Sequence, residues 1–524
     1  MLGLLYSPLT VALTFVTGIV GLLYWWSIST YDYWKKKGVP YEPPTPFFGN
    51  IKDVILMRRN FNLVHQDLYN KFEGHRFAGI YQARQPTLFL RDPELIKAVL
   101  VRDFNHFHDR GLLIHAEKNP LQQHLFNLPG YRWRVLRNKL SPTFTSGRMK
   151  NMFPLVEESS KKLNSFLNAA ASKEEIVEMK DILAKFSTDV IGTCAFGLQM
   201  NALDDPDSEF RRMGRKVFEP SFLSKFASLT NSLLPEIGRV LKMDDLGRGV
   251  SDFFMKVVKE TTDYRVKNNV SRNDFLQLLI NLKYKGRIDD AEEVEEKANG
   301  VNGKNKNVLD FDLDDGLMAA QAFVFFLAGF ETSSTTMSFA LQELAVHPEI
   351  QTKLREEIDD ELEKNGGKFT YDSIMNMKYL DKVVSETLRM YPPVQFLVRE
   401  VTAPYTIPDT KVSLEKGSIV IIPCFAIQRD PKHYPDPERF DPERFSEEEK
   451  AKRHHYTYLP FGEGPRNCIG MRFGLLQSKL GLAALLSKYE FHVCERTELP
   501  IRMDPKTLVT SSTTGTIVRI THRK

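Results

Sequence analysis

One cysteine near the end of the chain has surroundings that suit a metal ligand. Cys468 lies in the stretch FGEGPRNCIG (461–470), among glycines, a proline and an arginine. Apolar residues in 469–490 recur at three- and four-residue spacing, which predicts a helix that starts beside this cysteine. The unpaired N–H groups and the dipole at a helix N-terminus favour a thiolate, which is the form that binds metals. The glycines would let a flat ligand approach the backbone. The stretch therefore predicts a loop that aims one sulfur at a metal or a flat ligand.

The other three cysteines carry no such signal. Cys194, Cys424 and Cys494 stand in ordinary surroundings, and we interpret them as structural cysteines. No two cysteines form a CxxC pair, so the spacing gives no zinc site. Four cysteines in 524 residues are also too few for a disulfide framework, which indicates a reducing compartment.

A second stretch that could do chemistry, AGFETS (328–333), lies inside an apolar segment that predicts one long helix. Asp314 is a candidate N-cap, and a proline after residue 346 marks the end. Gly329 costs about 1 kcal/mol relative to alanine in a helix, and Thr332 can bond back to a carbonyl. Two interpretations remain: a local opening of the helix beside the acid Glu331, or a close helix crossing at Gly329. The residues alone favour the crossing.

The N-terminus predicts a membrane anchor. Residues 1–31 carry no charged side chain, and the apolar run 9–26 is long enough to cross a bilayer as a helix. Three lysines at 35–37 predict that the rest of the chain stays cytoplasmic. A cleaved signal peptide is the rival, but basic residues before the run and a small-residue cleavage site after it are lacking. Residues 32–50, basic and rich in proline, predict a stiff extended linker to a body formed by 51–524.

The composition of the body excludes some classes of protein. A net charge of +4 without a long basic run gives no indication of nucleic-acid binding, and 42% hydrophobic residues can bury a large core. The stretch 87–100 predicts a strand, a turn and a helix, and 413–423 predicts a hairpin around Gly417. Residues 287–307 are charged and rich in glycine and asparagine, and they predict a surface loop. The chain is expected to be mainly helical with small sheets.

The cysteine stretch also resembles a known signature. Phe461, Gly464, Arg466, Cys468 and Gly470 form the pattern FxxGxRxCxG, which is similar to the haem-binding signature of the cytochromes P450, the haem-thiolate monooxygenases. The resemblance extends from the proline-rich linker almost to the C-terminus. It implies the α+β cytochrome P450 fold, with 51–524 as a single haem-binding domain. It also implies that Cys468 is the axial thiolate of haem b, Fe-protoporphyrin IX.

The resemblance assigns roles to two further groups of residues. Glu331 and Thr332 match the acid and alcohol that supply protons for oxygen chemistry at the haem, which is general-acid work. Glu386 and Arg389 of ETLR (386–389) and Arg444 of PERF (442–445) match a buried charge network that supports the cysteine loop. The role of this network is structural, because removing one partner leaves a buried charge unpaired.

The resemblance also implies which residues contact the haem and the substrate. The haem propionates need cationic or N–H donors. Candidates for contact with the haem, apart from Cys468, are Arg110, Trp133, Arg137, Arg399, Phe461 and Arg466. Candidates for the wall of the substrate pocket are Phe126, Val324, Ala328, Val394, Gln395, Leu397 and Ser511.

The stretches 140–150, 347–359 and 456–477 are most similar to microsomal enzymes of insect family 6, which is related to the drug-metabolising family 3 of mammals. This resemblance implies oxidation of lipophilic xenobiotics such as plant toxins or insecticides at the endoplasmic reticulum. Electrons would come from NADPH through NADPH–cytochrome P450 reductase, with cytochrome b5 as a further candidate donor. Arg134, Lys139 and Arg472 are either a docking face for the reductase or ordinary surface charges.

Two rival functions stay open at this point. The first is a haem-thiolate isomerase or dehydratase that acts on a peroxide and needs no reductase; the Glu331–Thr332 pair argues against it. The second is a membrane-tethered protein that sequesters lipophiles without catalysis. Turnover without NADPH would support the first, and a failure to consume O2 would support the second.

Overall fold

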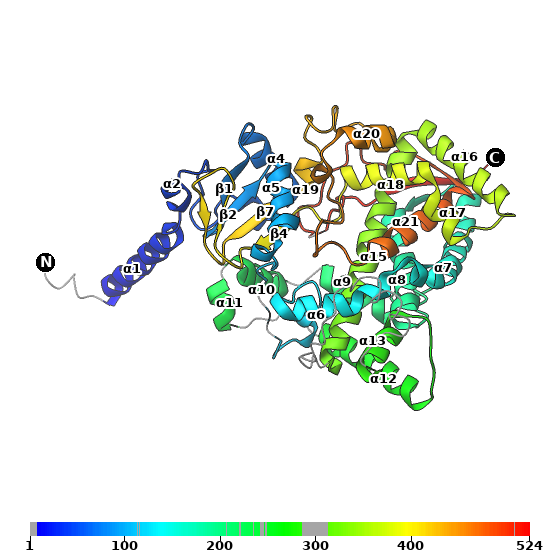
Figure 1. The fold of residues 1–524 in the computed structure, drawn as a ribbon, viewed down its shortest axis with the longest axis horizontal. Helices are drawn as coiled ribbons and strands as arrows, with labels where there is room; N and C mark the ends of the chain where they lie inside the picture. The colour runs from blue at the N-terminus through cyan, green and yellow to red at the C-terminus, as the bar shows by residue number, and fades with distance from the viewer. Residues whose placement is uncertain are drawn as a thin grey trace, which may run out of the picture.

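The computed structural model describes residues 8–112, 114, 116–205, 207–218, 222–233, 235–241, 246, 249–285, 313–507 and 509–523. The expected loop at 287–307 lies outside these residues. Helices dominate and three small sheets accompany them, as the sequence predicts (Figure 1).

The first half of the described chain consists mainly of helices and connecting loops, with one hairpin and one short strand. Its helices are α1 (Pro8–Ile28), α2 (Tyr33–Lys36), α3 (Lys52–Ile55), α4 (Phe61–Lys71), α5 (Pro93–Lys97), α6 (Gly130–Leu140), α7 (Ser146–Ser172), α8 (Met179–Ile191), α9 (Glu209–Phe218), α10 (Phe222–Leu233), α11 (Pro235–Leu241), α12 (Val250–Lys267) and α13 (Phe275–Lys285). The helices of the second half are α15 (Asp315–Val346), α16 (Pro348–Lys364), α17 (Tyr371–Asn376), α18 (Lys378–Met390), α19 (Cys424–Ile427), α20 (Glu447–Lys452) and α21 (Met471–Leu486).

The strands form one mixed sheet and two smaller antiparallel sheets. They are β1 (Phe77–Gln82), β2 (Gln85–Leu90), β3 (Ile176–Glu178), β4 (Leu397–Glu400), β5 (Tyr405–Thr406), β6 (Ser413–Leu414), β7 (Ile419–Ile422), β8 (Tyr489–His492) and β9 (Ile517–His522). The largest sheet has the order β1-β2-β7-β4, with β2 and β7 parallel and the other pairs antiparallel. The second sheet has the order β3-β9-β8, and β5 pairs with β6.

The expected hairpin at 413–423 is wrong. Gly417 does make a turn, with φ of +88°, but β6 before it pairs with β5, and β7 after it lies between β2 and β4. The reason is that three of the four residues of β7 are buried, so this strand is more stable at the centre of a sheet than in an isolated ribbon. The strand, turn and helix expected at 87–100 are confirmed by β2 and α5.

The long helix α15 runs through the helical body, and its bounds confirm the expected N-cap. The side chain of Asp314 accepts a hydrogen bond from the N–H of Leu317 at 2.6 Å. The helix has 32 residues and is therefore about 48 Å long. Helices α8 and α21 pack against it (Figure 1). A Cβ atom at Gly329 would lie 2.4 Å from Ile191 Cδ1, so the close helix crossing, rather than a local opening, is what the structure has at this glycine.

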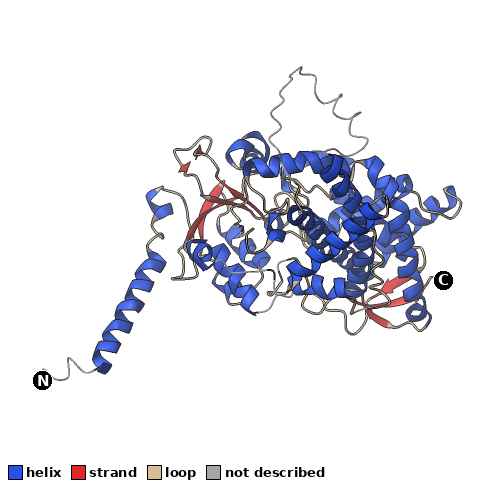
Figure 2. Cartoon of the chain, turned by 90° about the horizontal axis from the view of Figure 1, so that it is seen from below, coloured by secondary structure: helices blue, strands red, loops and turns tan. Residues whose placement is uncertain are grey.

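The N-terminal helix α1 projects from the body (Figure 2). Its length and mean hydropathy of 1.8 suffice for a membrane span, and only 6% of the apolar window is buried. Within the described residues α15 passes the same test, but 56% of its window is buried, as in a core helix. The apolar surface of α1 therefore supports a membrane anchor.

The segment 32–50, expected to be a linker, is docked on the sheet. Trp34 is 1% exposed, and its Nε1 donates a hydrogen bond to the carbonyl oxygen of Ile80 at 3.0 Å. Its ring leaves no room for a side chain at Gly79, where a Cβ atom would be 2.3 Å away. Tyr41 forms a parallel bridge with the same glycine. The prolines and lysines suggested an extended spacer, but burial of one tryptophan joins the segment to the body.

Candidate functional site

The loop before α21 presents Cys468 as expected. The N–H of Cys468 donates to the carbonyl oxygen of Phe461 at 2.8 Å, and the N–H of Asn467 donates to that of Gly464 at 3.0 Å. Gly470 is the N-cap of α21, so the cysteine precedes the helix by three positions. The cysteine side chain is exposed, whereas Phe461 packs against the helical core. The loop is therefore held by its own backbone and leaves the sulfur accessible.

The electrostatic surroundings of this thiol differ from the expectation. The protein atoms around the exposed Cys468 side chain partly desolvate its sulfur and so raise the pKa of Cys468, while the N–H of Gly470 and the positive charges of Arg137 and Arg110 act in the opposite direction. The helix N-terminus favours the thiolate as predicted, but desolvation outweighs it. A cation bound at the sulfur would reverse this balance, because a coordinating thiol is deprotonated.

Four arginines from separate parts of the chain lie around this loop. Arg466 is buried, and it donates to the carbonyl oxygens of His108 and of Leu128, the latter at 2.8 Å. Its guanidinium lies 4.1 Å from the centre of the Trp133 ring. Arg110 donates to the carbonyl oxygen of Arg466 at 3.4 Å. The tryptophan expected at the site thus supports an arginine of the cysteine loop.

The other two arginines come from α6 and β4. Arg137 donates to the carbonyl oxygen of Asn467 at 2.9 Å and to its side-chain oxygen at 2.7 Å. Arg399 is 1% exposed and donates to the carbonyl oxygen of Val398 at 2.8 Å. The expected set, Arg110, Arg137, Arg399 and Arg466, is therefore brought together, although Arg137 uses two of its donors to hold the residue before the cysteine.

The arginine cluster lacks enough negative charge. Asp109 lies 3.2 Å from Arg466. Burial lowers the pKa of Arg466 to about 9 and the pKa of Arg399 to about 10, while burial and the three other arginines lower the pKa of Arg110. An arginine with these values is still charged at pH 7. Within the described part of the chain, Nη1 of Arg466 and Nε of Arg399 are buried and have no hydrogen-bond partner. The cluster is built to receive an anion.

The acid and alcohol of α15 point to different neighbours. The Thr332 hydroxyl donates to the carbonyl oxygen of Ala328 at 2.7 Å, and Ala328 itself is exposed. The Glu331 carboxylate forms an ion pair with Lys180 of α8 at 2.8 Å. This lysine could not be predicted, since nothing in the linear sequence connects it to a residue some 150 positions later.

Comparison with known proteins decides the family. The family model for cytochrome P450 matches residues 39–518. The chain belongs to the cytochrome P450 family. It is 43% identical over 524 residues to a probable cytochrome P450 6a14 of Drosophila melanogaster, which covers 98% of this chain and 99% of that protein. It is 42% identical over 506 residues to cytochrome P450 6k1 of Blattella germanica, which covers 96% and 95%. The resemblance to insect family 6 is confirmed, and the protein is an oxidoreductase of the monooxygenase type.

The site of this cytochrome P450 fits the cofactor that the family implies. Family members hold haem through a cysteine thiolate. Here an accessible cysteine sulfur and a group of buried arginines with unused N–H donors lie together. The two propionates of haem are the kind of anion that guanidinium groups bind. Cys468 would therefore hold the iron, and Arg110, Arg399 and Arg466 would hold the propionates.

The charge network expected in this cytochrome P450 is present. Nε and Nη2 of Arg389 donate to the two carboxylate oxygens of Glu386 at 2.7 and 2.8 Å, and both side chains have no exposed surface. Arg444 lies 3.5 Å from the same carboxylate. The N–H of Asp441 donates to it at 2.9 Å. The Glu386 carboxylate thus accepts hydrogen bonds from two segments of the chain, and the two arginines compensate its negative charge.

A residue that the sequence analysis missed connects this network to the cysteine loop. Gln428 accepts from Arg389 through its carbonyl oxygen at 3.0 Å, and its side-chain N–H group donates back to the Arg389 carbonyl at 2.9 Å. The side-chain oxygen of Gln428 accepts from the N–H of Leu459 at 2.9 Å, and the carbonyl of Leu459 accepts from Gly462. Gln428 is fully buried, and its polar groups form hydrogen bonds with distant segments. Such a feature can be recognised only in the folded structure.

The proposed substrate-pocket residues do not share one environment. Val324, Ala328 and Thr332 follow one face of α15 at four-residue spacing. Phe126 is 48% exposed, with Arg110 4.0 Å from its ring centre, and Val394 is 43% exposed. The others have different surroundings: Gln395 is buried, Leu397 is 3.7 Å from the Cβ position of Gly462 in the cysteine loop, and Ser511 lines a small cavity beside Lys180.

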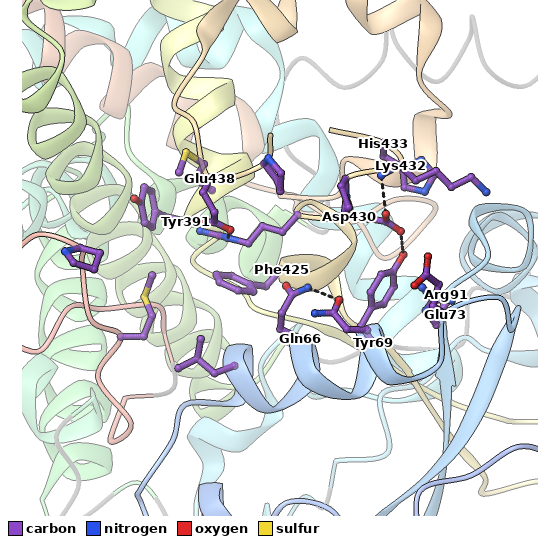
Figure 3. Close-up of a pocket in the computed structure, with 18 of the residues that line it drawn as sticks. Gln66, Tyr69, Glu73, Arg91, Tyr391, Phe425, Asp430, Lys432, His433 and Glu438 are labelled. Carbon is purple, nitrogen blue, oxygen red and sulfur yellow. Dashed lines mark hydrogen bonds and ion pairs between the residues drawn. The ribbon is translucent and has the colours of Figure 1, made fainter. Parts of the chain in front are cut away.

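A large groove of about 1550 Å³ lies away from this site. It is bordered by α4, by the C-terminal ends of α15 and α18 and by the loops around 430 and 500 (Figure 3). Several of its polar side chains contact one another: Tyr69 donates a hydrogen bond to Asp430 at 2.7 Å, and Arg91 lies 4.2 Å from the centre of the Tyr69 ring. Neither Cys468 nor Thr332 lines this groove. The size of a cavity therefore does not locate the chemistry of this cytochrome P450.

Proposed function

We propose that this protein is a membrane-anchored monooxygenase that inserts one oxygen atom from O2 into lipophilic small molecules. In this proposal the electrons come from NADPH through NADPH–cytochrome P450 reductase, and cytochrome b5 is a further candidate donor. The observation that carries the proposal is the accessible sulfur of Cys468 beside Arg399 and Arg466, each of which has a buried N–H donor without a hydrogen-bond partner among the described residues. These two features match the two parts of haem that a protein binds, its iron and its propionates.

Different residues of the chain would bind the haem and transfer protons. Haem, once bound, supplies the activation of O2. Cys468 would hold its iron, and Asn467 beside it is fixed by Arg137 so that the loop keeps its position. The Thr332 hydroxyl can give up its bond to the Ala328 carbonyl and pass a proton from the side of Glu331. Glu331, one residue earlier on the same helix, would relay protons to this hydroxyl.

Lipophilic xenobiotics, such as plant toxins or insecticides, are the proposed substrates. Apolar side chains at Val324, Ala328, Phe126 and Val394 suit such compounds, because apolar pocket walls bind them by burying surface from water. The relatives in insect family 6 are consistent with this class.

The proposed location is the endoplasmic reticulum membrane, with the catalytic body on the cytoplasmic side. Helix α1 supplies a span of 21 residues, and the lysines at 35–37 follow it. Positive residues on this side of a span favour cytoplasmic orientation. Arg134, Lys139 and Arg472 remain the candidate docking face for the reductase.

The direct test uses the full-length protein, purified with haem and combined with NADPH–cytochrome P450 reductase. We expect NADPH-dependent incorporation of isotopically labelled oxygen from O2 into members of a panel of lipophiles. We also expect the ferrous carbon monoxide complex to show the absorption band of a thiolate-ligated haem, and Cys468→Ala to abolish it. Peroxide turnover without NADPH would support the isomerase instead, and binding without O2 consumption would support the sequestering protein.

A further inference from the structure

Helix α6 begins without a cap from its own segment. The residue before its first position is Pro129, whose side chain has no group that could accept a hydrogen bond. The N–H of Gly130, the first residue of the helix, instead donates to Oδ1 of Asp109 at 2.7 Å. The first N–H groups of a helix have no partner within it, so this carboxylate from another part of the chain satisfies one of them. Asp109 thus fixes the start of α6.

The same carboxylate oxygen binds the arginine of the cysteine loop. Nη2 of Arg466 donates to Oδ1 of Asp109 at 3.2 Å and to the carbonyl oxygen of Leu128 at 2.8 Å. Nε of Arg466 donates to the carbonyl oxygen of His108. Among the described residues Nη1 of Arg466 has no hydrogen-bond partner, although it is buried. The other contacts therefore fix this guanidinium and leave Nη1 for an anion.

Asp109 is itself held rigidly. Its carbonyl oxygen accepts a hydrogen bond from the N–H of Glu400 in β4 at 2.8 Å, and Nδ1 of His108 lies 2.8 Å from its Oδ1. The side chain of Asp109 is only 13% exposed. An acceptor that is shielded from water and shared among several groups has little freedom to move. Asp109 therefore joins β4, α6 and the cysteine loop.

The shared oxygen also sets the distance between α6 and the cysteine loop. Trp133 follows Gly130 by three residues, which is about one helical turn. The centre of the Trp133 ring lies 4.1 Å from the Arg466 guanidinium, within the range of a cation–π interaction. Because the start of α6 and Arg466 bond to one atom, a shift of either would separate the ring from the cation. The contact between Trp133 and Arg466 therefore depends on Asp109.

We infer that Asp109 is a positioning residue for haem binding and that it acts through Arg466. Its Oδ1 holds the guanidinium so that Nη1 stays available to a propionate of haem. The inference rests on the role given above to Arg466 as a propionate ligand. Without this oxygen the Arg466 side chain loses a fixing contact and is free to turn away from the propionate. The requirement is for an acceptor oxygen at this place, so an amide oxygen in the position of Oδ1 should replace it.

The experiment measures how fast haem leaves the purified ferric protein for an excess of haem-free myoglobin. Asp109→Leu should accelerate this release by about tenfold, as expected for the loss of one hydrogen bond to a charged group. Asp109→Asn keeps an oxygen in the same place and should release haem at nearly the unaltered rate. In an Arg466→Met background Asp109→Leu should change the rate by less than about twofold, because two residues that act as a unit are not additive. Arg466→Lys provides the background if the methionine variant retains no haem.

Asp92→Leu is the matched control. Asp92 likewise accepts from an N–H at the start of a helix, that of Glu94 in α5 at 2.8 Å, and it pairs with an arginine, Arg76. Asp92 borders the large groove, which Cys468 does not line. Its replacement should therefore lower the free energy of unfolding without accelerating the release of haem.

Release from Asp109→Leu at the unaltered rate, or an equal acceleration by Asp92→Leu, would overturn the inference. So would a full effect of Asp109→Leu in the Arg466→Met background, or release from Asp109→Asn as fast as from Asp109→Leu. Asp109→Ala replaces Asp109→Leu in each comparison if the leucine variant retains no haem. An unaltered rate in Arg466→Met alone would instead overturn the role of Arg466 as a propionate ligand.

Discussion

Gly464 lies so close to Leu100 that a Cβ atom on the glycine would be 1.9 Å from the leucine carbonyl oxygen. The φ angle of Gly464 is +76°, a region that other residues seldom adopt. Leu100 belongs to the helical turn that follows α5, far from the cysteine loop in the sequence. This contact explains why a glycine is required four positions before the cysteine, and it seats the loop on the sheet-containing part of the molecule.

Gly464→Ala should therefore displace the cysteine loop. We expect the free energy of unfolding to fall by more than about 1 kcal/mol, and less haem to be retained, because the backbone oxygen of Leu100 cannot move aside easily. Denaturant unfolding and the ratio of haem to protein absorbance measure both effects. Gly474→Ala in α21 is the control, because the nearest atom to its Cβ position is 4.0 Å away. Full haem retention in Gly464→Ala would contradict this account of the loop.

Thr332→Ala should separate oxygen consumption from product formation. The variant loses the hydroxyl that bonds to the Ala328 carbonyl, so the proposed proton path is interrupted while the haem site stays intact. We expect an unchanged haem spectrum and a fall of about tenfold in product per NADPH. The control is Thr336→Ala, one turn further along, whose hydroxyl makes the same kind of bond to the Thr332 carbonyl at 2.9 Å. Normal coupling in Thr332→Ala would show that the proton path lies elsewhere.

Glu386→Gln should destabilise the protein strongly. The change leaves Arg389, which has no exposed side-chain surface, without its countercharge, and breaking a buried ion pair in this way costs about 3–5 kcal/mol. Denaturant unfolding of the haem-loaded protein measures the cost. Glu361→Gln, which breaks the more exposed pair with Lys364, should change stability little. Equal effects of the two substitutions would mean that burial does not set the strength of the network.

His65 should make the protein sensitive to mild acid. Burial among the rings of Phe61, Phe89 and Phe396 lowers the pKa of His65 from 6.5 to about 3, so the folded protein holds it neutral while the unfolded chain binds a proton below pH 6.5. The stability that its neutral form contributes is present above pH 6.5 and is lost as the pH falls toward 3. Between pH 7 and pH 5 this loss is about 2 kcal/mol.

The test compares unfolding at pH 7 and pH 5 in His65→Phe and in the unaltered protein. The substitution keeps a ring in the aromatic cluster and removes the titrating group, so the difference in unfolding free energy between the two pH values should shrink by about 2 kcal/mol. His75→Phe, at an exposed histidine, is the control. An identical pH dependence in His65→Phe would show that this histidine is not held neutral.

Several elements could be predicted from local sequence patterns, because for each of them one short stretch contains the whole pattern. The N-cap Asp314 and the apolar run after it define α15, and the glycines and cysteine of 461–470 define the loop before α21. The hairpin expected around Gly417 failed for the opposite reason: the partners of β7 are β2 and β4, which lie elsewhere in the chain. The docking of Trp34 on Gly79 likewise depends on a contact between segments that local pattern cannot reveal.

The sequence by itself determined the chemistry: one cysteine in a glycine-rich loop, an acid and an alcohol on one helix, and an apolar N-terminal run. Only the tertiary structure decided the charges around that chemistry. It gathered Arg110, Arg399 and Arg466 into a cluster short of anions and set Lys180 against Glu331. The reason is physical: helix and loop signals act over a few residues, whereas burial and charge pairing depend on which distant segments pack together.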